Sequence, residues 1–345
     1  SSAASDVYKR QAGAARPIEA AFMASLLKVV EATQAAQQAC ASVAESHPDF
    51  IRLQERATEL IKKAQGFTQA TDPQRVRWID IGPHHARLID SPLDIRALVA
   101  QQQAQTHRTW IYTSATLGDD EQLTWFTRSS GLESARILSV GSPYDYPEHA
   151  RCWVPSGLPE PQHPAHSKAV AEVAARCANI LGGRTFVLAT TLRALPLIAQ
   201  DMQSFLEREG SSVRVLVQGS EPKRNLLDRF LEYSTRGGAV LVGAASFWEG
   251  IDVPGSALQC VVIDKLPFPP PDDPLIEARS QSLKAQGREP FAELFVAEAA
   301  IALKQGAGRL IRSEEDRGLL VLCDPRLTSK AYGARLLASL PPLGR

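Results

Sequence analysis

Two arginines in the last forty residues of the sequence are candidates for binding a phosphate group. Arg309 and Arg312 lie in the stretch Gln305-Gly306-Ala307-Gly308-Arg309-Leu310-Ile311-Arg312. Apolar residues recur before it at helical spacing, which predicts a position at or just past a helix end. On one helical turn, arginines three residues apart would project to the same side. Their planar donors suit a phosphate, although two solvated arginines on a helix are the simpler alternative.

Pairs of hydroxyl side chains follow two apolar runs that read as buried strands. Ser114 and Thr116 come after Thr109–Thr113, and Thr190-Thr191 comes directly after Phe186–Ala189. Open α/β sheets bind their ligands at the carboxyl ends of strands. Hydroxyls and the following helix N-terminus can donate to a phosphate there. The alternatives are ordinary turn residues in the first case and capping of the helix predicted at 192–209 in the second.

A third segment, Phe247–Gly255, combines two carboxylates with an aromatic ring. Glu249 and Asp252 flank a tight loop beside Trp248, after an apolar strand at 239–242. Two carboxylates without a histidine or a third acid make a poor metal cage, so no metal site is predicted here. A loop with a stacked tryptophan is the alternative without function.

The order of these segments along the chain resembles a known family. Thr113–Leu117, Phe247–Gly255 and Gln305–Arg312 resemble motifs III, V and VI of the superfamily 2 DNA helicases of the DinG/YoaA group, relatives of the XPD helicase. The resemblance runs from roughly Trp110 to Pro342, and more loosely back to Arg16. Thr190-Thr191 is similar to motif IV, where the family commonly has Thr-Ser.

The resemblance implies a role for each candidate residue. Arg309 and Arg312 would act as arginine fingers on the γ-phosphate of ATP, a role that is worth ~10³–10⁵ in rate, and Gln305 would orient the nucleotide or the attacking water. The expected nucleotide contacts are Glu249, Gly250, Asp252 and Gly308. The expected contacts with single-stranded DNA are Ser114, Thr116, Thr190, Thr191 and Trp248.

Two motifs of such helicases are missing from the 345 residues. No G-x-x-x-x-G-K-[ST] phosphate loop occurs, and no Asp-Glu-Ala-His box precedes Thr113. The resemblance therefore implies the carboxyl-terminal half of a helicase, inactive alone, which would share its site for ATP and Mg²⁺ with a missing amino-terminal RecA-like domain. In family members that have a [4Fe–4S] cluster, its cysteines lie in that missing half.

The intact helicase would act in DNA repair or replication. The family implies 5′→3′ movement on single-stranded DNA and, for the YoaA branch, association with a replication clamp-loader subunit. The rival hypothesis is a stand-alone nucleic-acid-binding or partner-docking module without ATPase activity.

Composition is that of an ordinary globular chain with zero formal net charge, so no global basic field predicts nucleic-acid binding. The five cysteines form no C-x-x-C pair, which predicts no metal centre and fits a reducing cytoplasm. No run of about eighteen apolar residues occurs, so no membrane partner is expected.

Alternating strand and helix patterns in the second half predict an α/β fold with a doubly wound parallel sheet. The resemblance makes this RecA-like helicase domain 2, preceded by a remnant of the helical arch domain. We expect an artefact or a disordered segment at 1–11, resembling translated sequencing-adaptor read-through, a helical hairpin at 12–70, a remnant of RecA-like domain 1 at 71–125 and domain 2 at 126–345. The predicted strands of domain 2 are 151–154, 185–189, 213–217, 239–242, 260–263 and 318–322, and its predicted helices are 166–181, 192–209, 222–234, 273–285, 291–304 and 329–339. Before it, we predict a β-hairpin at 76–80 and 86–90 and a helix from 91 to about 103, capped by Ser91.

Overall fold

The computed structural model describes residues 8–11, 17–82, 85–105, 108–118, 120–244 and 253–344. They fall into two compact units. One lies within Ile95–Pro271 and Ser280–Arg345, and the other within Ser5–Asp94 and Asp272–Arg279. The two units are defined by contacts within the chain and do not test the predicted domain boundaries, which stay predictions. No helix in the described ranges is long and apolar enough to cross a membrane.

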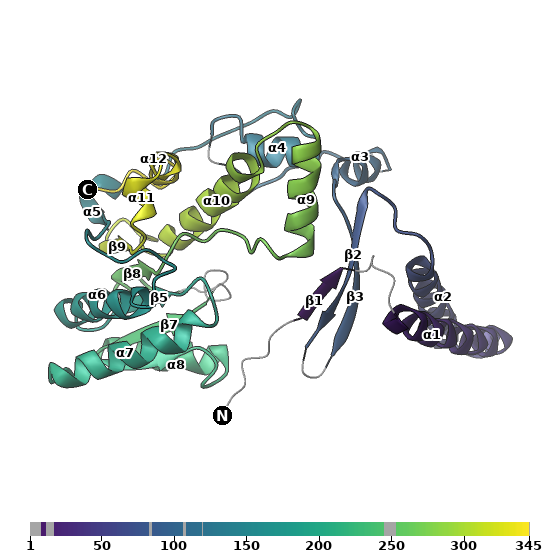
Figure 1. Cartoon of the computed structure of the whole chain (residues 1–345), viewed down its shortest axis with the longest axis horizontal. Coiled ribbons are helices and arrows are strands. Elements are labelled where there is room, and N and C mark those ends of the chain that lie inside the picture. Colours follow the sequence, from purple (N-terminus) through teal and green to yellow (C-terminus); the bar gives the residue numbers. More distant parts are fainter. Residues whose placement is uncertain are drawn as a thin grey trace. The chain divides into compact units, whose positions relative to one another are not determined.

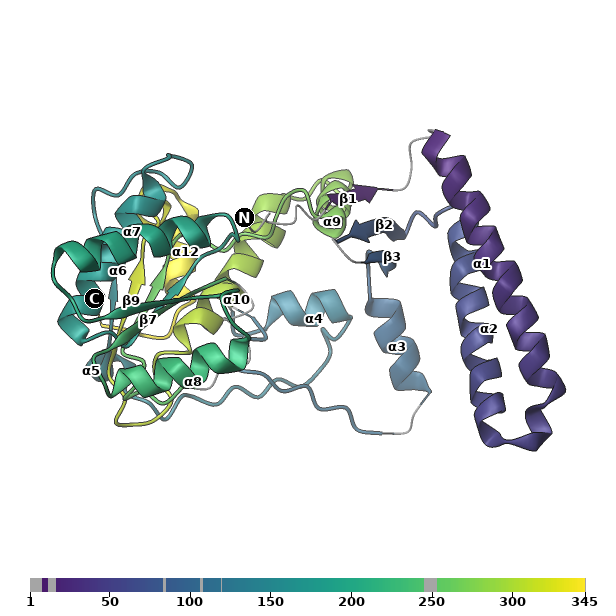
Figure 2. The same ribbon diagram turned by 90° about the horizontal axis from the view of Figure 1, so that it is seen from below.

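The predicted helical hairpin is confirmed. Helices α1 (Pro17–Ser42) and α2 (Pro48–Thr68) lie side by side (Figures 1 and 2). A short 3₁₀ turn, η1 (Ala44–Ser46), separates them. The His47 imidazole nitrogen Nδ1 then accepts a hydrogen bond from the Asp49 amide at 3.2 Å and caps α2. The buried side chains between the helices are Leu26, Val30, Ile61 and Ala64. That the pair belongs to an arch domain stays a prediction.

Three antiparallel strands, β1 (Tyr8–Gln11), β2 (Arg75–Ile81) and β3 (Ala86–Pro92), form a small sheet. The predicted β-hairpin is therefore confirmed. Tyr8–Gln11 pair with β2 and so are not disordered, whereas the expectation that residues 1–11 are an artefact stays a prediction. Asp90 holds the hairpin by accepting hydrogen bonds from the Arg75 and Arg77 Nε atoms at 2.7 and 3.1 Å.

The predicted start of the next helix is wrong. Ser91 does not cap a helix, because it lies in β3, where its partner is Val76. Helix α3 (Arg96–Ala104) begins five residues later and has no side-chain cap. Strand pairing thus decides where the helix begins, and a serine that looks like a cap is used as a strand residue.

The second sheet has six strands, and all of its pairings are parallel. The strand order is β4-β9-β8-β5-β7-β6, which confirms the predicted doubly wound α/β fold. The strands are β4 (Ala150–Trp153), β5 (Thr185–Leu188), β6 (Arg214–Val217), β7 (Ala239–Gly243), β8 (Cys260–Ile263) and β9 (Gly318–Leu322). All six strands expected here are confirmed to within two residues.

Helices α6, α7, α8 and α10 pack against the two faces of the sheet, and further helices lie along the same part of the chain (Figure 1). These helices are α6 (His166–Leu181), α7 (Ala194–Arg208), α8 (Lys223–Ser234), α9 (Pro274–Ala285), a π-helical turn η3 (Phe291–Phe295) running into α10 (Val296–Ala307), α11 (Arg326–Ser329) and α12 (Tyr332–Ala338). Two short helices, α4 (Thr124–Ser130) and α5 (Tyr146–His149), precede β4.

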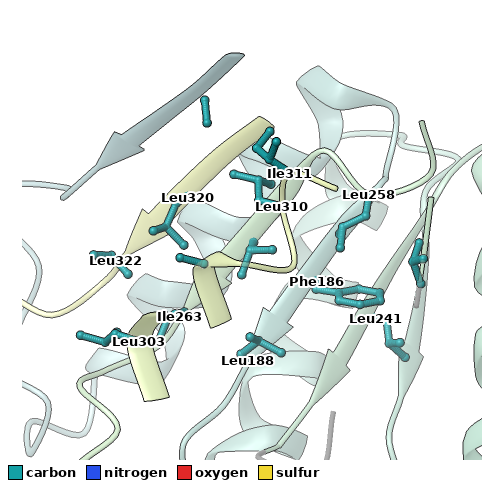
Figure 3. Close-up of a cluster of buried hydrophobic side chains, with 14 of the residues drawn as sticks. Phe186, Leu188, Leu241, Leu258, Ile263, Leu303, Leu310, Ile311, Leu320 and Leu322 are labelled. Atoms are coloured by element: carbon teal, nitrogen blue, oxygen red, sulfur yellow. The ribbon is translucent and has the colours of Figure 1, made fainter. Parts of the chain in front are cut away.

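Alternate residues of each strand face opposite layers, as the two-residue period of a strand requires. In β5, Phe186 and Leu188 join a buried cluster with α8, α10 and α12, drawn in Figure 3. Val187 joins a second buried cluster with α6 and α7. Apart from the buried Thr185, the strands between the edges are apolar on both faces, which is why they read as continuous hydrophobic runs in the sequence.

One predicted strand is wrong. Residues Thr109–Thr113 form no strand, and Ile111 is 79% exposed. A strand needs a hydrogen-bonded neighbour, and no described residue pairs with this segment in a sheet. The Trp110 and Tyr112 rings instead stack 6.3 Å apart, and Tyr112 also contacts the Phe126 ring in α4.

Candidate functional site

The predicted site residues gather at two opposite edges of the parallel sheet. Thr190 follows the carboxyl end of β5 after one residue, whereas Arg312 precedes the amino end of β9 by six residues. Because all six strands run in the same direction, Thr190 lies at the side of the sheet where the strands end and Arg312 at the side where they begin. The fold therefore separates Thr190 and Thr191, which are predicted to contact nucleic acid, from Arg312, which is predicted to contact ATP.

The arginine stretch begins where α10 ends. The helix stops at Ala307, and the amides of Gly308 and Arg309 bond back to Lys304 and Gly306 carbonyls at 2.9 and 3.2 Å. Arg309 and Arg312 are thus past the helix and not on one helical turn, so our argument that helical spacing puts them on one side is wrong. Both arginines are half-buried.

Between the two arginines, Leu310 and Ile311 anchor the chain. Their side chains are buried in the core cluster with α10 and β9. Gly318 adds to this packing, because a Cβ there would come within 2.4 Å of Leu310. The arginines therefore leave the core from a segment whose backbone is held on both sides.

The Arg312 backbone is held by two further groups, the Asp316 carboxylate and the Tyr144 hydroxyl. Asp316 accepts hydrogen bonds from the Arg312 and Ser313 amides at 2.8 and 2.9 Å, and from the Ser313 hydroxyl at 2.8 Å. The Tyr144 hydroxyl donates to the Arg312 carbonyl at 2.7 Å. These contacts fix where the Arg312 side chain begins, a requirement for a charge that must meet a reacting group.

A cavity of about 560 Å³ lies against this loop. Gly255 forms part of its wall, and a Cβ at this residue would lie 2.0 Å from the Asp316 carboxylate. Arg312 and Arg317 line this cavity beside the acidic Glu315 and Asp316, whereas Arg309 is not among its lining residues. The two guanidinium groups suit an anionic ligand. The lining residues are Pro254, Gly255, Ser256, Gln259, Arg312, Ser313, Glu315, Asp316 and Arg317.

Gln305 and Thr116 meet, although they belong to separately predicted motifs. The Gln305 side-chain amide donates to the Thr116 hydroxyl at 3.4 Å. Thr116 is placed by a local turn in which its amide donates to the Ser114 hydroxyl at 3.1 Å. Of the predicted DNA contacts, Thr116 therefore lies beside the predicted nucleotide residues, and Ser114 is exposed next to it.

At the other edge, Thr190 and Thr191 are held in different ways. The Thr190 amide donates to the Asp264 carboxylate at 2.9 Å. The Thr191 hydroxyl accepts a hydrogen bond from the Ala194 amide at 3.3 Å, at the start of α7. The capping alternative is not confirmed as predicted, because α7 begins at Ala194 with Arg193 at its N-cap position and no side-chain cap. Thr191 is exposed, and Thr190 is half-buried.

Asp264 is a buried acid that the sequence analysis missed. Asp264 follows directly after β8 and is only 1% exposed to solvent. Burial raises the pKa of this carboxyl, while hydrogen bonds from the Thr190 and Lys265 amides act in the opposite direction. The sequence signal was present, because a carboxylate directly after four apolar strand residues must be paired if it is buried.

Four predicted residues lie outside the described residues: Trp248, Glu249, Gly250 and Asp252. Their proposed roles stay predictions. Gly308, the remaining predicted nucleotide contact, is exposed at the end of α10.

The described residues do not fit a magnesium ion. No group of three or more His, Cys, Asp or Glu side chains among them is arranged to hold a metal. At the cavity, both Asp316 oxygens already accept hydrogen bonds from the Arg312 loop. No step involving Mg²⁺ is therefore assigned to these residues.

Comparison with known proteins gives a consistent relationship. Residues 174–343 match the helicase C-terminal domain family. The ATP-dependent DNA helicase YoaA of Escherichia coli (strain K12) is 38% identical over 291 residues, which are 84% of this chain and 44% of that protein. The ATP-dependent helicase DinG of Mycobacterium tuberculosis (strain ATCC 25177 / H37Ra) is 35% identical over 280 residues, covering 79% and 41%.

Among solved structures, Xpd4 of S. tokodaii superposes with a TM-score of 0.54 at 15% identity, covering 98% of this chain and 60% of that one. This likeness shows a shared fold. The chain spans less than half the length of the YoaA and DinG proteins it matches. Residues 174–343 thus match the helicase C-terminal domain family, and most of the chain is similar to a part of the DinG and YoaA helicases.

Proposed function

We propose that this chain is the carboxyl-terminal part of an ATP-dependent DNA helicase, which couples ATP hydrolysis to 5′→3′ translocation on single-stranded DNA. The observation that carries the proposal is the pair of polar sites on one parallel sheet. One has arginines beside a cavity, and the other has threonines at a strand end. A translocating helicase needs one site for ATP and a separate site for single-stranded DNA.

Arg309 and Arg312 would stabilise the transition state of ATP hydrolysis. Water attacks the γ-phosphorus while the bond to the β,γ-bridging oxygen breaks, which gives ADP and phosphate. Negative charge spreads over the γ-phosphoryl oxygens, and guanidinium groups held in place stabilise it without reorganising. The hydrogen-bonded Arg312 backbone supplies that preorganisation.

Gln305 would orient the nucleotide or the attacking water, with its amide held by Thr116. This contact links the segment at 108–118 to the arginine stretch, and so offers a route by which the state of the nucleotide is reported to that segment. The amino-terminal RecA-like domain would supply the phosphate loop and the metal-binding carboxylates that this sequence lacks.

Strand displacement by the longer protein tests the proposal. The protein in which this chain is joined to its amino-terminal part should unwind a duplex with a 5′ single-stranded tail and leave a 3′-tailed duplex intact. ATP hydrolysis should increase when single-stranded DNA is added. A protein that hydrolyses no ATP under these conditions contradicts the proposal.

Single-stranded DNA binding by the 345-residue chain tests the proposed DNA site at Thr190 and Thr191 separately. Affinity should be weak and fall with salt, with a slope of about −0.7 in log affinity against log salt for each phosphate contacted. Titration of a labelled oligonucleotide at several salt concentrations measures it. Binding that is absent at the lowest salt, or that does not change with salt, removes the threonine site from the proposal.

A further inference from the structure

Two buried carboxylates bridge neighbouring loops along the carboxyl edge of the sheet. Asp264, after β8, reaches the loop after β5 at Thr190. Asp324, after β9, reaches the loop after β8 by accepting the Leu266 amide at 2.8 Å. Each side chain is 1% exposed. A carboxylate is costly to bury unless it is hydrogen-bonded. The amides that bond to Asp264 and Asp324 are therefore the backbone groups that these two side chains hold in place.

The Asp264 carboxylate holds the Thr190 turn directly. Its Oδ1 atom accepts the Thr190 amide at 2.9 Å and the Lys265 amide at 2.7 Å. Oδ2 lies 3.5 Å from the Thr190 hydroxyl, which donates to it. Two backbone amides from different strand ends thus share one oxygen, and the geometry of the turn depends on that oxygen.

The Asp264 backbone carbonyl is held by a buried histidine. The His166 ring, 3% exposed, lies between two carbonyl oxygens, with Nε2 2.9 Å from the Asp264 carbonyl and Nδ1 2.8 Å from the Pro159 carbonyl. Carbonyl oxygens only accept, so the ring donates to at least one of them. The carboxylate therefore extends from a residue whose own position is restrained.

This arrangement distinguishes the two threonines. The Thr190 hydroxyl proton is directed to Asp264, so it is engaged inside the protein. The Thr191 oxygen accepts the Ala194 amide, which uses a lone pair and leaves its own proton to donate. Thr191 is also the exposed member of the pair. Of the two, Thr191 is thus the donor suited to an external phosphate.

We propose that Asp264 is a positioning residue, whose carboxylate fixes the Thr190 backbone so that the Thr191 hydroxyl meets a backbone phosphate of single-stranded DNA. The DNA contact rests on the proposed function, whereas the hold on Thr190 is a property of this chain alone. Burial raises the pKa of the Asp264 carboxyl, so the fold keeps this acid against an energetic penalty.

A set of variants of the 345-residue chain tests the proposal. Asp264→Ala removes both acceptor oxygens. Asp264→Leu also removes them but keeps the side-chain volume, in case the alanine variant does not fold. Asp264→Asn is the conservative rescue, because its Oδ1 can still accept both amides. Asp324→Asn and Asp324→Ala are the matched controls, since Asp324 is equally buried and does not contact Thr190. Circular dichroism and thermal melting confirm that each variant is folded.

DNA affinity is the first measurement. The folded Asp264→Ala or Asp264→Leu variant should bind a single-stranded oligonucleotide about tenfold more weakly at low salt. Its salt slope should be shallower by about 0.7, the loss of one phosphate contact. Asp264→Asn should stay within about twofold of the unmodified chain, as should the folded Asp324 controls.

Amide hydrogen exchange at Thr190 is the second measurement and needs no DNA. The Thr190 amide should exchange at least about tenfold faster in Asp264→Ala or Asp264→Leu than in the unmodified chain. Asp264→Asn and the Asp324 controls should keep its protection. Equal exchange in all variants would show that Asp264 does not hold the turn and would overturn the inference.

The two proposals fail in distinguishable ways. If the unmodified chain does not bind DNA at the lowest salt, the proposed DNA site fails and the DNA role of Asp264 fails with it, whatever the exchange rates are. If the unmodified chain binds DNA and the folded Asp264→Leu variant binds it equally well, the DNA site stands and Asp264 has no positioning role. If the Asp324 controls lose as much affinity as the Asp264 variants, the effect is one of general stability and the inference is again overturned.

Discussion

The side-chain amide of Gln305 donates a hydrogen bond to the hydroxyl of Thr116, across 3.4 Å and 189 residues of chain. Both residues are candidates from the sequence, Gln305 for the nucleotide and Thr116 for DNA. Their contact makes them one unit, because a change to either one frees the other.

Thr116→Val and Gln305→Ala should therefore be non-additive in the longer protein that carries the amino-terminal domain. Each should lower the DNA-stimulated ATPase rate, and the double variant should be little worse than the worse single one, since residues that act as a unit share one loss. Steady-state ATPase rates with saturating DNA complete the cycle. Effects that multiply would show that the two side chains act independently.

Arg309→Ala and Arg312→Ala should each lower kcat of the longer protein steeply, by about 10³-fold or more, with DNA affinity largely kept. An arginine finger acts on charge that develops in the transition state, so its loss lowers kcat more than ground-state binding. Lysine should not rescue either position, because a point charge cannot replace the planar fork. Near-normal kcat with lost DNA binding would assign these arginines to the DNA track.

The 345-residue chain alone should not hydrolyse ATP. Its sequence holds neither the glycine-rich phosphate loop nor the Asp-Glu-Ala-His box that normally bind the β- and γ-phosphates and Mg²⁺. Phosphate release from purified chain, with and without single-stranded DNA, measures this. A DNA-stimulated rate that Arg312→Ala abolishes would refute the prediction, and a rate that survives Arg312→Ala would point to a contaminating enzyme.

Asp264 should make the chain's stability fall as pH rises. Burial raises the pKa of its carboxyl in the folded state, so the folded state binds this proton more tightly than the unfolded state does. Starting from the unfolded value of about 3.9, the free energy of unfolding therefore decreases until pH passes the raised folded value. Asp264→Asn removes this contribution. Urea unfolding of both proteins from pH 4 upward should show the asparagine variant gaining relative stability, and parallel pH profiles would contradict it.

Gly255→Ala should disturb the loop from Arg312 to Asp316, which is distant from Gly255 in sequence but adjacent to it in space. Its Cβ would lie 2.0 Å from the Asp316 carboxylate, which cannot move away without releasing the Arg312 and Ser313 amides. We expect a loss of about 1–3 kcal/mol in the free energy of unfolding, and a lower kcat in the longer protein. Gly141→Ala is the control, because no heavy atom lies within 4 Å of the Cβ it would add. Equal stability of the two variants would show that the loop adapts freely.

The amino-acid sequence was enough to predict the strands and helices of the six-stranded sheet. The six predicted strands and the alternating helices agree with the structure, and α6 has the predicted ends, His166 and Leu181. The physical reason is that helical and strand periodicities are carried by residues close together in the chain. The order of motif-like segments was likewise sufficient to indicate the helicase family.

The grouping of the candidate residues depends on the three-dimensional fold. Strand order places β5 beside β8, and this neighbourhood brings Asp264 to Thr190 across 74 residues. It also determined that Thr109–Thr113, which reads as a buried strand, forms none here, because no described strand pairs with it. Hydrogen bonds between distant segments depend on which strands become neighbours, and periodicity within one segment carries no information about that choice.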